Sequence, residues 1–144
     1  VDRVTADGSD TSFFSERFLE TPAVAGAFET LSRLGRERFG QRICIVSKCG
    51  PRTEEKTRLW LAHHGLLDGL GLDEQALHFC RKRPDKAPIC KRLGVTHFID
   101  DRMDVLVHLT SVRYKILFGP QESGVNAKGA IRAETWRDVA SRLL

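Results

Sequence analysis

The sequence predicts an α/β protein, an α/β sandwich built around a mainly parallel sheet. Segments with apolar residues at three- and four-residue steps alternate with short apolar runs of the length of buried strands. The chain has 144 residues, enough for one domain with a real core and too few for a large second one. We therefore expect residues 1–144 to form a single domain.

Proline and glycine divide the first part of the chain. Thr21-Pro22 has the pattern of a helix start, because threonine caps helices and proline suits the first helical position. Either Gly35 or Gly40 is expected to end this helix. A buried strand is expected next, at residues 42–47. The apolar face of the helix consists of Val24, Phe28, Leu31 and Leu34.

A second helix is expected to begin at Pro51, to turn Leu59 and Trp60 inward and to end at Gly65. The later elements follow the same alternation of helix and strand. In order, they are a strand at 77–80, a helix from Asp85 to Gly94, a strand at 96–99, a helix at 101–109, a strand at 114–118, a long loop at 119–133 and a final amphipathic helix around Trp136.

Polar residues suited to bind a phosphate and a divalent cation stand at or near the ends of three predicted strands. Ser47 follows an apolar run, Lys86 lies in the first turn of a helix, and Asp100-Asp101 end another apolar run, with Asp104 three residues later. A lysine is unfavourable at a helix amino end, which fits a side chain directed at phosphate. Simpler interpretations remain: Asp101 as a helix cap, Asp104 as a first-turn acid and Lys86 as a surface lysine.

The order and spacing of these residues resemble the haloacid dehalogenase (HAD) superfamily of phosphotransferases. Ser47 matches its second motif, Lys86 its third and Asp100-Asp101 its fourth. The opening Val1-Asp2-Arg3-Val4-Thr5-Ala6-Asp7-Gly8 looks like the tail of the first motif, Asp-x-Asp-Gly-Val-Leu-Thr-Asp-Gly. Asp2 then matches the second aspartate, and the nucleophilic aspartate is expected one residue before Val1. Arg3 departs from the motif, which has glycine there.

The resemblance implies a Rossmann-type, three-layer α/β/α fold without a large cap domain, whose central first strand begins upstream of Val1. It also implies an Mg²⁺-dependent phosphatase that forms an aspartyl-phosphate. Asp2 would serve as acid and base and, with Asp100 and Asp101, would hold Mg²⁺. Lys86 is implied as a second catalytic residue, directed at the phosphate and at the nucleophilic carboxylate. Ser47, Lys86 and the amides of Lys48 and Cys49 would bind the phosphate. Supporting roles are implied for Asp7, which would orient the loop, and for Asp104, which would hold metal-bound waters.

Three functions are open at this point. The first is hydrolysis of a small phosphorylated substrate, a nucleotide or a sugar phosphate, in an open site that a second copy in a homo-oligomer would cover. The second is a catalytically inactive HAD-fold domain for binding or scaffolding, which Arg3 favours. The third is processing of nucleic-acid ends, suggested by the basic residues between Arg81 and Arg92 but less favoured than a solvated basic rim.

Composition bears on the kinds of ligand, the location and the state of the cysteines that we expect for this protein. A net charge of +4 weakly favours anionic ligands. The longest apolar runs are far too short for a membrane span, and the amino terminus lacks the pattern of a signal peptide, so a cytoplasmic protein is expected. The four cysteines lack the spacing of a structural zinc site and are expected to be reduced thiols.

Overall fold

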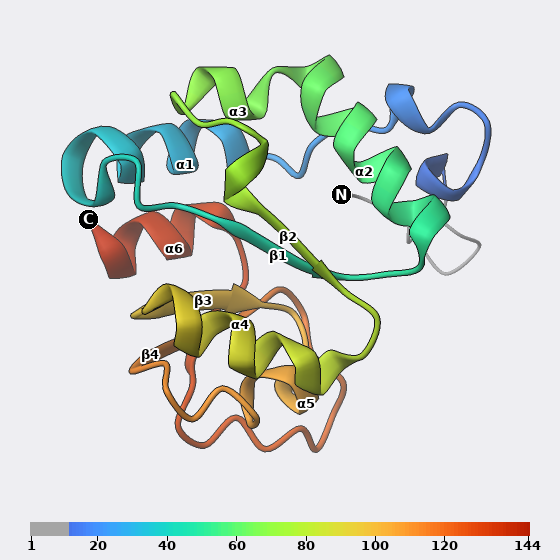
Figure 1. Cartoon of the computed structure of the whole chain (residues 1–144). Helices are drawn as coiled ribbons and strands as arrows, with labels where there is room; N and C mark the ends of the chain where they lie inside the picture. Colours follow the sequence, from blue (N-terminus) through green and yellow to red (C-terminus); the bar gives the residue numbers. More distant parts are fainter. Residues whose placement is uncertain (1–11) are drawn as a thin grey trace.

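The computed structural model describes residues 12–144, so the predicted site residues Asp2 and Asp7 lie outside the described part of the chain. As predicted, the protein is α/β and its strands are parallel. Strand β1 (Ile45–Lys48) pairs with β2 (Leu77–Cys80), and a second sheet has the order β3 (His97–Asp100), β4 (Tyr114–Phe118) and β5 (Ile131–Ala133) (Figure 1). Within residues 12–144 no strand joins β1 to β3, and the strand expected upstream of Val1 lies outside this range.

Six α-helices surround these strands in the described part of the chain. Helices α2 and α3 lie above β1 and β2 in Figure 1, and α4 and α5 lie beside β3 and β4. Helix α4 also packs against β1 and so connects the two sheets. No described element forms a separate cap domain. The helices are α1 (Ala27–Leu34), α2 (Pro51–His64), α3 (Leu66–Gly69), α4 (Lys86–Leu93), α5 (Met103–Leu106) and α6 (Trp136–Leu143).

Alternation along β4 shows the layering of the sandwich. Ile116 and Leu117 are adjacent and fully buried, yet they belong to different apolar clusters, since successive strand residues point to opposite faces. Leu117 packs with residues of α4 and α5, and Ile116 with residues of α1 and α6. A third cluster, which includes Trp60 of α2 and Leu77 of β2, fills the space under α2. The three-layer order of helix, sheet and helix therefore holds around β4.

The prediction that a helix starts at Thr21-Pro22 is wrong, because the first α-helix begins at Ala27. Thr21 is completely buried and instead connects two segments of the chain, the one around Ser12 and helix α2; we call this contact the tether at Thr21. Its hydroxyl lies 2.6 Å from the Ser12 Oγ, and its carbonyl accepts a 2.9 Å hydrogen bond from the indole N–H of Trp60. Gly26, with φ of 81°, then turns the chain into α1, a conformation that favours glycine.

Three other details differ from the expectations. Leu59 is half exposed rather than inward-facing, whereas Trp60 is buried as expected. The helix expected at 101–109 is a short one, α5, and the expected loop at 119–133 contains the strand β5 at its end. Pro51 and Gly65 do bound α2, and the strands expected at 77–80 and 114–118 are present within the same bounds.

Candidate functional site

The predicted site residues of the described chain gather at one end of the strands. Strands β1, β2 and β3 run in the same direction in Figure 1, with their carboxyl ends at the right of the view, and α4 starts on that side and runs back. Ser47 and Lys48 end β1, Lys86 begins α4, and Asp100 ends β3. Polar side chains in separate parts of the sequence are thereby carried to one side of the molecule.

The most buried contact at this side is an ion pair between Lys86 and Asp100. The Lys86 ammonium donates to the Asp100 Oδ2 over 2.8 Å, and the two side chains are 11% and 7% exposed. The same ammonium lies 5.8 Å from the centre of the Phe98 ring. The other oxygen, Asp100 Oδ1, accepts the backbone N–H of Arg102 over 3.0 Å. Lys86 is thus a buried partner of the acidic pair and not a surface lysine.

Burial is the main influence on the acidity of Asp100. It raises the pKa of this carboxyl, since removal from water disfavours the charged form. The hydrogen bond and the charge of Lys86 act in the opposite direction, as does the N–H of Arg102, while the neighbouring Asp101 adds to the rise. The net result is a pKa of Asp100 above the ordinary aspartate value. The negative charge of this carboxyl therefore depends on the ammonium of Lys86 beside it.

Asp101 is exposed, and its carboxylate has no hydrogen-bond or ion-pair partner within residues 12–144. Its backbone is held instead: the Asp101 carbonyl accepts the Gln121 Nε2–H over 2.9 Å, and the same nitrogen donates to the Phe118 carbonyl over 3.2 Å. Gln121 therefore fixes the chain after β3 to the end of β4. Nothing in the sequence pattern indicated this role, because Gln121 falls in the expected long loop.

Asp104 is engaged by Arg102, which donates from Nε and Nη2 to its two oxygens over 2.9 and 2.8 Å. The guanidinium lowers the pKa of Asp104 below its usual range. Both side chains are about half exposed. The expectation that Asp104 holds metal-bound waters did not foresee this pair, although the two-residue spacing of Arg102 and Asp104 was a visible signal.

Ser47 is partly buried opposite Phe79, and its hydroxyl has no hydrogen-bond partner among the described residues. Lys48 is exposed. The amide of Cys49 was expected to be free to bind phosphate. It is instead engaged, because it donates to the Cys80 carbonyl over 3.0 Å. On the same turn Arg81 donates to the Cys49 carbonyl over 2.9 Å, which further orders the chain after β1.

The carboxylates at this side are ligands of the kind that Mg²⁺ takes. Mg²⁺ takes oxygen ligands, keeps several waters and is commonly bound through one or two carboxylates. Asp100 already uses both oxygens, so the unpartnered Asp101 is the carboxylate that remains available. Residues 12–144 hold no group of three or more His, Cys, Asp or Glu side chains that could enclose a metal by themselves.

A comparison with known proteins shows a distant similarity. No protein-family profile matches the chain. The chain is 26% identical over 127 residues to a protein of Oceanobacillus iheyensis named "Putative nucleotidase OB0422", which covers 88% of this chain and 64% of that relative. The chain thus spans less than two thirds of the length of the relative that it matches. None of the described helices is both long and apolar enough to cross a bilayer.

Proposed function

We propose that the chain belongs to an Mg²⁺-dependent phosphatase of the HAD type, which hydrolyses a small phosphomonoester such as a nucleotide. The observation that carries the proposal is the buried pair of Lys86 and Asp100 at the strand ends, beside the unpartnered carboxylate of Asp101. The similarity to a protein named as a nucleotidase supports the same class of reaction and suggests a nucleotide substrate.

In this proposal Lys86 and Ser47 bind the phosphoryl oxygens. Asp100 holds the lysine in place. The serine hydroxyl is free to donate to the phosphate, since it makes no hydrogen bond with a described residue. Asp101, together with Asp2, would hold Mg²⁺, which would supply positive charge against the phosphate oxygens. Positioning and charge neutralisation are what phosphoryl transfer requires of a protein.

The covalent step uses the aspartate proposed to precede Val1. One oxygen of its carboxylate bonds to phosphorus, the phosphorus–oxygen bond to the alcohol breaks, and the leaving oxygen takes the proton of the Asp2 carboxyl. Asp2, now a carboxylate, then takes a proton from water as that water attacks phosphorus. The bond between phosphorus and the first aspartate breaks, which releases inorganic phosphate and regenerates both carboxyl groups.

The test measures phosphate release by the full chain, including the residue that precedes Val1, from a panel of nucleoside and sugar monophosphates. We expect release with Mg²⁺ and its loss with a chelator. Asp101→Asn should lower kcat by about a hundredfold or more, and so should Lys86→Met when assayed under conditions in which circular dichroism shows that it is folded. The matched control is Glu122→Gln, an exposed carboxylate after Gln121, which should leave kcat unchanged. Absence of release from every monophosphate tested would reject the proposal.

The alternative is a catalytically inactive HAD-fold domain that binds or scaffolds. Arg3, where the motif has glycine, is the observation that favours it. The gene sequence immediately upstream discriminates between the two: aspartate before Val1 supports the enzyme, whereas asparagine, serine or glycine there supports the binding domain.

A further inference from the structure

A shallow cavity of about 160 Å³ lies at the opposite end of the strands from the candidate site, where α4 ends and β3 and β4 begin. Lys91, Thr96, Ser111 and Arg113 contribute its polar lining. Thr96 precedes β3 and Asp100 ends it, so strand geometry separates the cavity from the Lys86–Asp100 pair by roughly 13 Å. The two places are therefore distinct.

The cavity carries positive charge that no acidic side chain among its described lining residues balances. Lys91 and Arg113 are exposed, and neither has an ion-pair partner within residues 12–144. No carboxylate is among the described residues that line it. Cys90 also lines it, but burial raises the pKa of this thiol to about 11, so Cys90 adds no negative charge near neutral pH.

Arg113 is held in position by a stack of rings. Its guanidinium carbon lies 5.3 Å from the centre of the Tyr114 ring, and Tyr114 stacks on His97 with ring centres 4.5 Å apart. The Thr96 hydroxyl lies 2.8 Å from the His97 Nδ1, which ties the hydroxyl to the same stack. The Ser111 hydroxyl has no hydrogen-bond partner in the described part of the chain.

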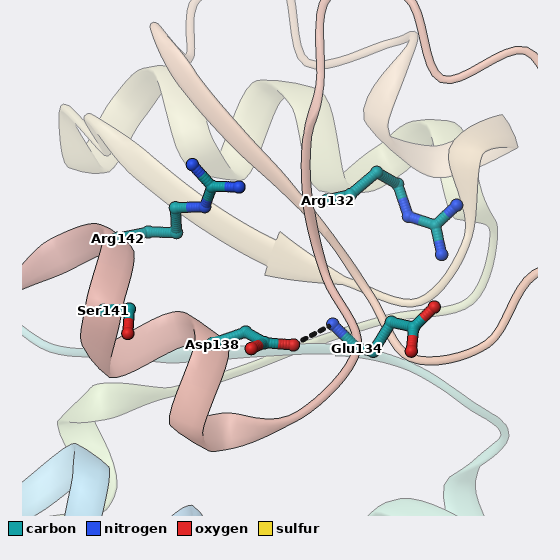
Figure 2. Close-up of a pocket in the computed structure, with 5 residues that line it drawn as sticks. All are labelled: Arg132, Glu134, Asp138, Ser141 and Arg142. Atoms are coloured by element: carbon teal, nitrogen blue, oxygen red, sulfur yellow. Dashed lines mark hydrogen bonds between the residues drawn. The ribbon is translucent and has the colours of Figure 1, made fainter.

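A second cavity, of about 320 Å³, provides a contrast (Figure 2). It is also lined by two arginines, Arg132 and Arg142, but Glu134 and Asp138 line it as well, so its positive charge is balanced. The larger volume therefore does not make it an anion site. Of these two cavities, only the smaller combines two cations and two hydroxyls without an acid.

One feature of the smaller cavity opposes an anion, namely the carboxyl end of α4, which carries a partial negative charge. Two of the carbonyls at this end accept hydrogen bonds, however. Gly94 N–H donates to the Lys91 carbonyl over 3.2 Å, and Val95 N–H donates to the Cys90 carbonyl over 3.0 Å. Two full positive charges outweigh the partial charge of about half an electron.

We propose that this cavity is a second phosphate-binding site, which takes a phosphate group through Lys91, Arg113 and the hydroxyls of Ser111 and Thr96. A guanidinium and an ammonium are the side chains that bind phosphate most strongly, and hydroxyls complete the donor set. The phosphate group can be inorganic phosphate or the group of a small phosphomonoester. This inference does not rest on the proposed catalytic function.

The test is a titration of the ¹⁵N-labelled full chain with inorganic phosphate at constant ionic strength, followed by amide chemical shifts. We expect saturable shifts at Thr96, Ser111 and Arg113. Arg113→Gln and Lys91→Gln should each weaken the affinity by about tenfold, the effect of losing one charged hydrogen bond. The matched control is Arg142→Gln in the charge-balanced cavity, which should leave the affinity unchanged. Both side chains to be changed are exposed, so we expect the variants to keep the wild-type spectrum elsewhere.

Further measurements distinguish this explanation from others. The shifts at Thr96 and Ser111 should persist in Ser47→Ala, a change at the proposed catalytic site that should keep the fold, and this separates the two sites. Repeating the titration with a sugar monophosphate distinguishes an ester from free phosphate: tighter binding of either one supports the proposal and names the source. Shifts that fail to saturate, that chloride reproduces, or that Arg113→Gln and Ser111→Ala both leave intact would overturn it.

Discussion

Replacing Lys86 by methionine should destabilise the fold strongly at neutral pH and only weakly in acid. Methionine keeps most of the apolar stem but removes the ammonium that lies 2.8 Å from the Asp100 Oδ2. The carboxylate is 7% exposed, so water cannot replace the lost donor, and only the N–H of Arg102 remains on its other oxygen. Breaking one side of a buried ion pair costs about 3–5 kcal/mol.

The pH dependence follows from the pKa of Asp100, which burial already raises and Lys86 opposes. Without Lys86 this pKa rises further, and each added unit is worth about 1.4 kcal/mol. A carboxyl with a raised pKa in the folded state favours folding when protonated. Its contribution is therefore complete below the unfolded pKa of about 3.9 and is lost as the pH rises through the folded pKa. The cost of Lys86→Met thus shrinks as the pH falls.

Urea unfolding followed by circular dichroism, at about pH 7 and about pH 4, measures both effects. The matched control is Arg92→Met, which removes an exposed cation from the same helix and should cost less than about 0.5 kcal/mol. Asp100→Asn in the Lys86→Met background should recover part of the loss at neutral pH. An equal loss at both pH values, or a loss no larger than that of Arg92→Met, would refute the buried-pair reasoning.

Three more outcomes are expected. Thr21→Val removes a hydroxyl from a completely buried position and should lower the free energy of unfolding by about 1–3 kcal/mol; an unchanged melting temperature would contradict the tether at Thr21. Ser47→Ala should change the free energy of unfolding by less than about 0.5 kcal/mol, because the Ser47 hydroxyl has no described partner. It should raise KM for the phosphorylated substrate, and a large loss of stability would show a structural role instead. Gln121→Ala removes the donor to the Asp101 carbonyl and should lower the free energy of unfolding by about 1 kcal/mol. It should also weaken Mg²⁺ binding measured by calorimetry, and an unchanged Mg²⁺ affinity would limit Gln121 to a structural contact.

Elements bounded by strong local signals were predictable from the sequence. Proline at the first position and glycine after the last define α2, and its bounds are Pro51 and His64. The strand Leu77–Cys80 followed from a short apolar run between polar segments. At the site, the approach of Lys86 to Asp100 could be expected because parallel strands carry their carboxyl ends, and the helix starts that follow them, to one edge.

What the sequence missed depends on contacts between distant residues. Thr21 has the chemistry of a helix cap, but its burial against Trp60 outweighs that local preference. Strand β5 has only three residues after a polar loop, and its pairing with β4 is what makes it a strand. The contact of Gln121 with the chain after β3 likewise depends on a side-chain position that no period in the sequence encodes, whereas the pairing of Asp104 with Arg102 was visible in their two-residue spacing.

The parallel pairing of all the described strands bears on how quickly the chain can fold. A parallel pair cannot be closed by a tight turn and needs a connection of about a dozen residues or more. β1 must therefore wait for the whole of α2 before it meets β2, and β3 reaches β4 only after α5. Chains dominated by such distant contacts acquire their native state more slowly than helical bundles of equal length. During synthesis, the backbone edge of β1 that pairs with β2 is thus left unpaired until the ribosome has delivered Cys80.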